Sequence, residues 1–440
     1  MSGRRLRDVS KRVVITGLGP VTPVGIGKEP CWKSLVEGRP GAKRIDFPGF
    51  DMDQYKTKIA APIENFDFSD YVIETKKSKY LGRTSRFAIA GTMLALKDAN
   101  LAVELNEERP KEGQYRIRDV NSFHAGAILG IGVENMDLME TYHENFLEHR
   151  GPKRISPFGL PHIYMSSIAS NVADRFTLRG STYTVSSACA SGTHAIINAY
   201  RQIQQGSEDV MVTGGVDACI TPYVFGGFVV LRAMSTRNDE PQRASRPFDA
   251  ERDGFVMAEA AGILVLERLE HALERETSIY AELIGYGMTA DAYHITEPDP
   301  RGGSLIRAIT LALENSGVAP REIHYINPHG TSTRLNDAVE TLAIKKALGK
   351  WAYQIPVSST KSITGHCMGA AGGVEAIATA LTIERGIIHP TINYEYPDPE
   401  CDLDYVPNEP RKAAVKTAMS ISAGFGGVNS AIIMRQFEGI

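Results

Sequence analysis

The sequence predicts an α/β fold in which parallel sheets are buried between helices. Short apolar or β-branched runs at residues 13–16 and 125–129 lead into glycine-rich turns, as buried strands do. A helix is expected at residues 30–37, and residues 85–99 space their apolar side chains as a helix does. Strands that alternate with helices of this length favour parallel pairing in a sheet that helices cover on both faces.

The same order of elements recurs in the second half of the chain. Apolar residues at helical spacing over residues 305–313 are followed by Gly317, a typical helix end, and then by a predicted strand at residues 323–327. This recurrence indicates a structural duplication. Because no low-complexity linker interrupts the chain, we expect residues 1–275 and 276–440 to form two halves of one compact body.

Composition excludes several classes of protein. The chain has 440 residues, of which 42% are hydrophobic and 23% charged, so it is long enough for one large domain or two packed halves. A formal net charge of -4 gives no overall basic field, which argues against a nucleic-acid partner. There is no run of 18 apolar residues, and the basic start leads directly into a predicted strand, so neither a membrane span nor a signal peptide is expected.

The cysteines are odd in number and scattered. Five cysteines without a CxxC pair or a metal-ligand spacing make a disulfide framework or a metal site improbable. We therefore expect a reducing, cytoplasmic compartment.

One cysteine stands in an unusual local context. Residues 183–194, with the sequence YTVSSACASGTH, form a predicted strand that runs through small residues into an amphipathic helix. Cys189 is therefore expected at a strand-to-helix turn, where the helix N-terminus favours the thiolate and small neighbours let a thioester approach. The alternative is a buried structural cysteine, and the turn alone leaves these two interpretations equal.

Two of the eleven histidines strengthen the catalytic interpretation. His329 lies in the segment NPHGTST and His366 ends the segment STKSITGH, each in a glycine-flanked turn after a predicted strand. Loops at strand ends carry catalytic groups more often than other positions do. The other nine histidines are expected to be structural.

Together these segments resemble the beta-ketoacyl-[acyl-carrier-protein] synthases of the type II elongating group, in the thiolase-like superfamily. The resemblance covers nearly the whole chain, with further motifs at residues 237–239 (RND), 245–249 (SRPFD), 252–256 (RDGFV) and 424–427 (GFGG). It implies a duplicated thiolase-like fold layered α-β-α-β-α with two mixed sheets. It also implies an acyltransferase that joins an acyl thioester to malonyl-carrier protein by decarboxylative Claisen condensation in fatty-acid chain elongation.

The resemblance also implies the roles of the reactive residues. Cys189 would take the acyl group as a thioester, and His329 and His366 would stabilise the enolate that forms when carbon dioxide leaves. The N–H groups of Cys189 and Phe425 would form the oxyanion hole. Phe425, flanked by glycines, would also gate access to the cysteine, although a core aromatic is the alternative.

Further residues are implied as support for these groups. Lys361 and Glu375 would hold the histidines through a charged hydrogen-bond network, with a carboxylate on a helix face as the alternative for Glu375. Thr331 and Thr333 would hold the phosphopantetheine arm, with turn capping as the alternative. This chemistry requires no metal and no organic cofactor.

Substrate and partner sites follow from the same resemblance. Val133 and Phe228 would bound the acyl pocket beside a dimer interface. Docking of an acidic carrier protein would use a basic cluster, although such a cluster is often only a solvated face. The docking candidates are Lys76, Lys77, Lys79, Arg83 and Arg232. The protein would pair with itself or with a related subunit.

Some positions depart from the family pattern, and several alternatives remain. Glu134 and Asn135 stand where relatives usually have two glycines, which points to a specialised acyl chain and leaves a type II polyketide or polyene ketosynthase open. A non-catalytic chain-length factor would lack the cysteine that stands at position 189. A biosynthetic thiolase would need a second active cysteine after Cys401, and an initiating synthase would have asparagine where His366 stands.

Overall fold

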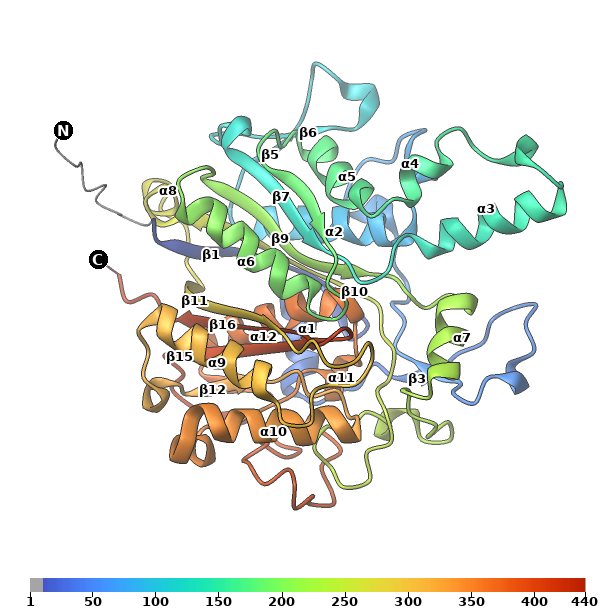
Figure 1. Cartoon of the computed structure of the whole chain (residues 1–440). Coiled ribbons are helices and arrows are strands. Elements are labelled where there is room, and N and C mark those ends of the chain that lie inside the picture. Colours follow the sequence, from blue (N-terminus) through green and yellow to red (C-terminus); the bar gives the residue numbers. More distant parts are fainter. Residues whose placement is uncertain (1–10, 440) are drawn as a thin grey trace, which may run out of the picture.

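A computed structural model describes residues 11–439 of the chain (Figure 1). The basic start of the chain, for which no signal peptide is expected, lies outside the described residues except for its last two positions. Within the described residues, ten strands form one mixed sheet in the order β12-β15-β16-β11-β1-β10-β9-β7-β8, with β2 paired to β1. The predicted α/β class is confirmed.

One half of this sheet comes from the N-terminal part of the chain. Its strands are β1 (Val13–Thr22), β2 (Gly25–Ile26), β7 (Ala125–Gly130), β8 (Thr182–Val185), β9 (Val210–Asp217) and β10 (Ala260–Arg268). Strand β7 is parallel to β8 and β9, whereas β10 is antiparallel to β9 and β1.

The other half comes from the C-terminal part. Its strands are β11 (Ala281–Ala290), β12 (Tyr325–Asn327), β15 (Thr417–Gly424) and β16 (Val428–Arg435). Only β12 and β15 pair in parallel, because β15 and β16 form a hairpin and β11 pairs antiparallel to β16. The local patterns favoured parallel pairing, yet more than half of the ladders in this sheet are antiparallel, so the sheet is mixed, as the resemblance implies.

The two sheets that the resemblance implies are joined into one. Strands β1 and β11 pair over three positions only, Val13 with Leu283, Val14 with Glu282 and Ile15 with Ala281. After Ile15 the register of β1 shifts, and the two strands diverge.

Helices complete five layers. The helices α6 (Ser191–Gln204) and α12 (Ala371–Arg385) lie between the halves, where each contacts strands of both. The outer face of the N-terminal half is covered by α2 (Arg83–Asp98) and α5 (Ser166–Phe176), and that of the C-terminal half by α9 (Gly303–Ser316) and α10 (Arg334–Leu348). A central hydrophobic core and two outer ones follow these layers.

The remaining elements lie around these layers. The other helices are α1 (Lys28–Val36), α3 (Met136–Glu148), α4 (Gly159–Ile163), α7 (Pro222–Leu231), α8 (Leu269–Glu274) and α11 (Lys361–Thr364). Short ladders join β3 (Lys43–Arg44) to β4 (Ile59–Ala60), β5 (Val103–Leu105) to β6 (Tyr115–Ile117), and β13 (Ile387–Ile388) to β14 (Arg411–Lys412). No helix among residues 11–439 is both long and apolar enough to cross a bilayer.

Strand β1 shows where glycine misled the sequence interpretation. The segment Gly-Leu-Gly-Pro was expected to be a loop, yet the strand continues through it to Thr22 and all ten residues are buried. A Cβ on Gly17 or Gly19 would lie about 2 Å from a backbone oxygen of α2. These glycines therefore allow a helix to pack directly on the strand, and they do not mark a turn.

Candidate active site

Cys189 occupies the turn between β8 and α6. The preceding residue, Ala188, has a φ of +49°, a left-handed conformation that is uncommon for a residue with a Cβ. The backbone N–H of Phe425 lies close enough to the Cys189 sulfur to act against the rise of the thiol pKa. A Cβ on Gly424 would lie 3.2 Å from the Cys189 nitrogen, so glycine at this position lets the β15–β16 loop rest on the cysteine turn.

The environment of the sulfur favours the neutral thiol. Burial raises the pKa of Cys189 to about 11, while the charge of Lys361 and the N–H of Phe425 act in the opposite direction. The sequence-based expectation that the helix N-terminus favours the thiolate is outweighed by this burial. At neutral pH the thiol is therefore protonated.

His329 and His366 reach the same place from different elements. His329 follows β12, as predicted, whereas His366 follows the short helix α11 and is separated from it by Gly365, which has a φ of +74°. The strand predicted before His366 was therefore wrong. The two imidazole rings are 5.3 Å apart between centroids and nearly perpendicular.

Lys361 and Glu375 lie beside the histidines. Lys361 Nζ is 3.2 Å from His329 Nδ1 and donates to the His329 carbonyl over 2.6 Å, and it forms an ion pair with Glu375 of α12. An ammonium group only donates hydrogen bonds, so His329 Nδ1 accepts and its hydrogen is on Nε2. Both members of this ion pair are buried.

The histidines are neutral at physiological pH. Burial holds the pKa of His329 and of His366 well below the usual range, and the positive charge of Lys361 adds to this effect. A neutral imidazole with hydrogen on Nε2 can donate a hydrogen bond to a carbonyl or enolate oxygen.

Two carboxylates of α10 fix the His329 loop. Glu340 accepts the N–H groups of His329 (2.6 Å) and Gly330 (2.7 Å), and burial raises its pKa to about 8. Asp337 accepts the N–H of Thr331 over 3.0 Å. The sequence shows both acids close after the HGTST segment, but nothing in that spacing assigned them a task.

An arginine supports the same loop from the other side. Arg252 is buried and donates to the carbonyl oxygens of Thr333 (3.2 Å) and Arg334 (3.1 Å). It also donates to Asp398 over 2.5 Å and lies 3.6 Å from Asp337. The RDGFV motif therefore supplies an arginine that clamps residues 331–334, which we call the threonine segment.

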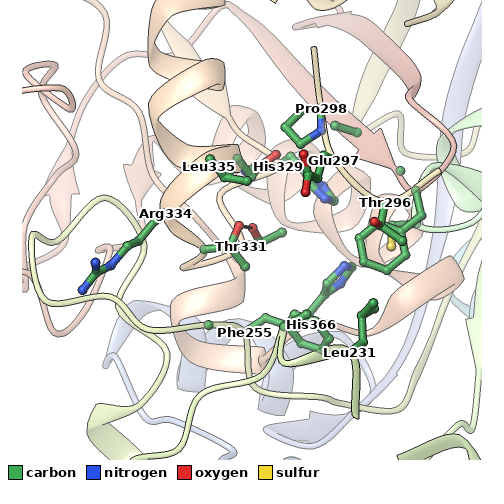
Figure 2. Close-up of a pocket in the computed structure, with 18 of the residues that line it drawn as sticks. Leu231, Phe255, Thr296, Glu297, Pro298, His329, Thr331, Arg334, Leu335 and His366 are labelled. Atoms are coloured by element: carbon green, nitrogen blue, oxygen red, sulfur yellow. Dashed lines mark hydrogen bonds between the residues drawn. The ribbon is translucent and has the colours of Figure 1, made fainter. Parts of the chain in front are cut away.

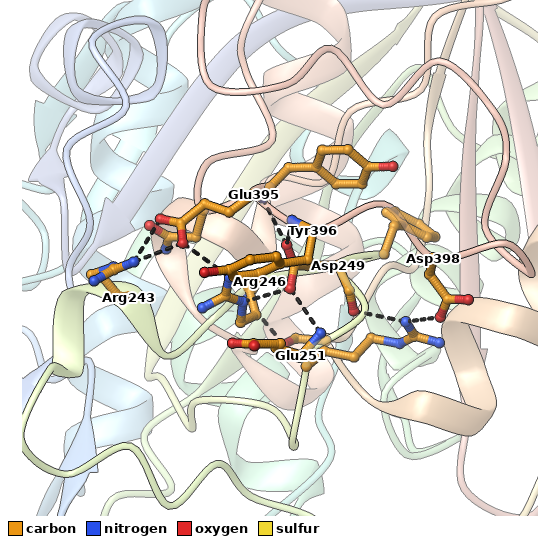
Figure 3. Close-up of polar contacts among 12 residues, drawn as sticks. Arg243, Arg246, Asp249, Glu251, Glu395, Tyr396 and Asp398 are labelled. Atoms are coloured by element: carbon orange, nitrogen blue, oxygen red, sulfur yellow. Dashed lines mark hydrogen bonds and ion pairs between the residues drawn. The ribbon is translucent and has the colours of Figure 1, made fainter.

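A second buried arginine extends this network (Figure 3). Arg246 forms an ion pair with Asp249 at 2.9 Å. Asp249 also accepts hydrogen bonds from the N–H groups of Glu395 and Tyr396, each with a donor–acceptor distance of 2.7 Å. The N–H of Arg246 donates to Ser332 Oγ over 2.9 Å. The SRPFD motif thus ties the loop between β13 and β14 directly to the buried Asp249, and Arg246 links the threonine segment to the same acid.

A cavity of about 460 Å³ opens onto the cysteine and both histidines. Figure 2 shows His366 and Thr331 facing the same space, with the Arg334 side chain turned away from it. The predicted site residues that line it are Cys189, Phe228, Arg232, His329, Thr331, Thr333, His366 and Phe425. The structure therefore brings together residues that are up to 236 positions apart in sequence.

Side chains in this cavity are arranged in two groups. The hydroxyls of Thr331 and Thr333 are 2.9 Å apart and form a polar pair. On the apolar side, the Phe228 ring stacks on Phe425 at 6.3 Å and meets Phe255 edge-on at 5.7 Å.

Val133 lies next to the cavity but does not line it. It packs, partly buried, in an apolar cluster with Cys189, Phe225, Phe228 and Met368, which we call the Cys189 cluster. An apolar chain attached to the cysteine would find its favourable surroundings among these side chains.

The docking candidates separate into two places. Arg232 lines the cavity, at the left-handed end of α7. Lys76, Lys77 and Lys79 are exposed just before α2, where Lys77 pairs with Glu112.

Arg83, the fifth docking candidate, differs from the three lysines. Its guanidinium donates to the buried Glu259 over 2.6 Å and 2.9 Å and to the Ile63 carbonyl over 2.6 Å. Much of its hydrogen-bonding capacity is therefore used within the fold.

Two family models match the chain. The model of the beta-ketoacyl synthase N-terminal domain matches residues 10–272, and that of the C-terminal domain matches residues 280–395. The chain belongs to the beta-ketoacyl synthase family. Among residues 11–439, no group of three or more His, Cys, Asp or Glu is arranged to hold a metal ion.

Similar curated proteins share one name. The chain is 43% identical over 428 residues to a "3-oxoacyl-[acyl-carrier-protein] synthase 2" of Synechocystis sp., covering 97% of this chain and 99% of that protein. It is 41% identical to the proteins of the same name from Coxiella burnetii, covering 96% and 98%, and Staphylococcus aureus, covering 98% and 99%.

Solved structures of other beta-ketoacyl synthases have the same architecture. A type II ketosynthase in complex with its acyl-carrier protein, AntDE:AntF, is 35% identical with a TM-score of 0.87, covering 97% of this chain and all of that one. A beta-ketoacyl synthase from Burkholderia phymatum is 34% identical with the same TM-score and coverage. The ishigamide ketosynthase/chain length factor is 32% identical with a TM-score of 0.87, covering 98% of this chain and all of that one.

Proposed function

We propose that this protein is a 3-oxoacyl-[acyl-carrier-protein] synthase that condenses a cysteine-bound acyl group with malonyl-carrier protein. The observation that carries the proposal is one shared cavity lined by Cys189, His329 and His366, with the Phe425 N–H beside the sulfur. The identity of 41–43% to three enzymes of that name supports it.

The first step loads the acyl group. The Cys189 sulfur attacks the thioester carbonyl of an acyl-carrier protein, and the carrier sulfur leaves and takes the proton that the thiol loses. The Cys189 and Phe425 N–H groups would stabilise the oxyanion of the tetrahedral intermediate. The flanking glycines of Phe425 fit its role as a gate.

The second step forms the carbon–carbon bond. His329 and His366 donate hydrogen bonds to the malonyl thioester oxygen, so that carbon dioxide leaves and the electron pair becomes an enolate. The enolate carbon attacks the acyl-Cys189 carbonyl, the cysteine sulfur leaves and regains a proton, and a 3-oxoacyl-carrier protein is released. Lys361 and Glu375 hold the His329 ring. The two reaction steps use no resident metal or organic cofactor.

The arm of the carrier protein would enter through the same cavity. The paired hydroxyls of Thr331 and Thr333 are suited to the amide groups of phosphopantetheine, and Val133 and Phe228 bound the acyl chain. Arg232 at the cavity and the basic cluster before α2 would receive an acidic carrier protein. A relative solved with its acyl-carrier protein supports this partner.

The proposal also covers the division of the chain into halves, the compartment and the oligomeric state. The chain would divide near Arg275, where α8 ends, into an N-terminal half with Cys189 and a C-terminal half with both histidines. The enzyme would act in the cytoplasm, which its five free cysteines fit. It would work as a homodimer or with a related subunit.

A second candidate is a ketosynthase of a type II polyketide or polyene pathway. The structural likeness to AntDE:AntF and to the ishigamide ketosynthase favours it. A non-catalytic chain-length factor is disfavoured because Cys189 is present beside both histidines.

The proposal is tested by intact-mass measurement after incubation with acyl-carrier protein. One acyl mass per chain is expected, and Cys189→Ala should abolish it, whereas acylation that persists in this variant would refute the nucleophile. His329→Ala and His366→Ala should lose carbon dioxide release from malonyl-carrier protein more severely than acylation, and normal release in both would refute their roles. The masses of products from a panel of acyl groups separate fatty-acid from polyketide substrates.

A further inference from the structure

A buried acid joins the loop that carries Val133 to the loop that carries Met368, two side chains of the Cys189 cluster. Asp217, the last residue of β9, is fully buried. Its Oδ1 accepts the Val133 N–H over 2.9 Å, and its Oδ2 accepts the N–H groups of Gly132 over 2.9 Å and Gly369 over 2.6 Å. Residues 132 and 133 follow β7, and Gly369 comes three residues after His366.

The junction leaves no spare space. A Cβ on Gly132 would lie 2.8 Å from Asp217 Oδ2, and one on Gly369 would lie 2.2 Å from the Gly132 nitrogen. Real Cβ atoms do not approach other atoms this closely, so both positions need glycine for the acid to reach all three N–H groups. The spacing between the two loops is therefore set by one side chain.

Both loops carry walls of the Cys189 cluster. Val133 follows the Gly132 contact directly, and Met368 precedes Gly369. Both side chains pack with Cys189 in the same apolar cluster, and Met368 also lines the cavity. An acyl chain bound to Cys189 must pass these two side chains if it enters this cluster.

We propose that Asp217 is a positioning residue that sets which acyl-chain lengths Cys189 accepts, by holding the Val133 loop against the Met368 loop. This inference rests on the proposed function. Among the described residues, Asp217 makes no hydrogen bond to the sulfur or to either histidine. Its charge does raise the pKa of the Cys189 thiol, but that effect is the same for every acyl group, so an effect on chain length passes through the two loops.

Only a carboxylate satisfies this junction. Three N–H donors meet two oxygens, and above the Asp217 pKa of about 7 the ionised carboxylate presents no hydrogen of its own. An amide of the same shape has one acceptor oxygen and an NH₂ group, so at least one donor faces another donor. In the less costly orientation, the amide oxygen still accepts the N–H groups of Gly132 and Gly369, and the NH₂ group faces the Val133 N–H. The Val133 loop then loses its hydrogen bond and is released.

The test compares Asp217→Asn with parent enzyme across butyryl, octanoyl and palmitoyl carrier proteins. Releasing the Val133 loop widens the cluster, so the ratio of kcat/KM for palmitoyl over butyryl should rise about tenfold, a change in the range that a few methylenes cause. Gly132→Ala disturbs the same junction from its other side and should raise the ratio in the same direction. It also decides the question if Asp217→Asn does not fold.

Glu208→Gln supplies the matched control. Glu208 is also a buried acid and accepts one backbone N–H, that of Ser181 at 2.7 Å, but at the opposite end of β8 from the cysteine turn. Its substitution should leave the chain-length ratio within about twofold of the parent.

A purely structural loss of active protein lowers every rate together and leaves the ratio unchanged. An unchanged or reduced ratio in folded Asp217→Asn, or in folded Gly132→Ala if the first does not fold, would overturn the inference. Parent enzyme that condenses none of the three acyl groups would instead count against the proposed function.

Discussion

Replacing Arg252 by methionine tests whether the threonine segment depends on a buried clamp. Methionine keeps much of the side-chain volume but offers no hydrogen-bond donor. The change removes donors from the carbonyls of Thr333 and Arg334 and from the Asp398 carboxylate, and it removes the charge that faces Asp337.

The size of the effect follows from burial. Removing one partner of a buried ion pair costs about 3–5 kcal/mol of folding free energy, because the remaining charge has no compensation. Burial already raises the pKa of Asp337 and the Arg252 charge opposes that rise, so Asp337 becomes easier to protonate in the variant. Since Asp337 accepts the Thr331 N–H, the threonine pair should lose its fixed position, and KM for malonyl-carrier protein should rise about tenfold.

The assay measures chemical unfolding and the kinetics of condensation, with Arg175→Met as the matched control. Arg175 is also buried, and it donates hydrogen bonds to the backbone carbonyls of Ile73 and Gly113, each at 3.0 Å. It does not line the cavity. The control should lose stability without a change in KM. An Arg252→Met enzyme with parental KM, or an equal rise in KM for both variants, would refute the clamp.

Two further predictions concern the sulfur and the acyl chain. Because burial raises the pKa of Cys189 to about 11, its rate of alkylation by iodoacetamide should rise about tenfold per pH unit between about pH 7 and 10, and a plateau within that interval would contradict the neutral thiol. Val133→Phe adds volume beside Cys189 in the apolar cluster, so it should shorten the longest accepted acyl chain while butyryl transfer stays nearly intact; equal losses for both chain lengths would count against Val133 as the length gate.

The sequence predicted the elements of the fold better than their pairing. Helical spacing located α2 to within two residues, and Gly317, expected as a helix end, does end α9, in a left-handed conformation. Strand direction was missed because local apolar runs look alike in parallel and antiparallel ladders. The β15–β16 hairpin, with Phe425 in its three-residue loop, has no local signal beyond its glycines.

For the candidate site, the sequence located the reactive groups and, through the resemblance, the Lys361–Glu375 pair, but it missed the buried acids that hold the surrounding loops. Cys189, His329 and His366 stand in glycine-rich turns that are visible in a single chain. By contrast, Asp217 holds backbone N–H groups 85 and 152 residues away. Because its partners are backbone atoms, no residue type marks them in the sequence, and only the folded chain brings them together.

The buried acids around this site work against stability at neutral pH, which argues that they are present for positioning. Burial raises the pKa of Asp217 to about 7 and that of Glu340 to about 8, although each accepts backbone N–H groups. An unfolded chain ionises these carboxyls near pH 4, so between about pH 4 and 7 the folded state binds more protons and its stability from these groups falls as the pH rises. Apolar residues would avoid that loss but could accept no hydrogen bond from the loops that carry His329, Val133 and Gly369. The acids therefore trade folding free energy for fixed loop positions.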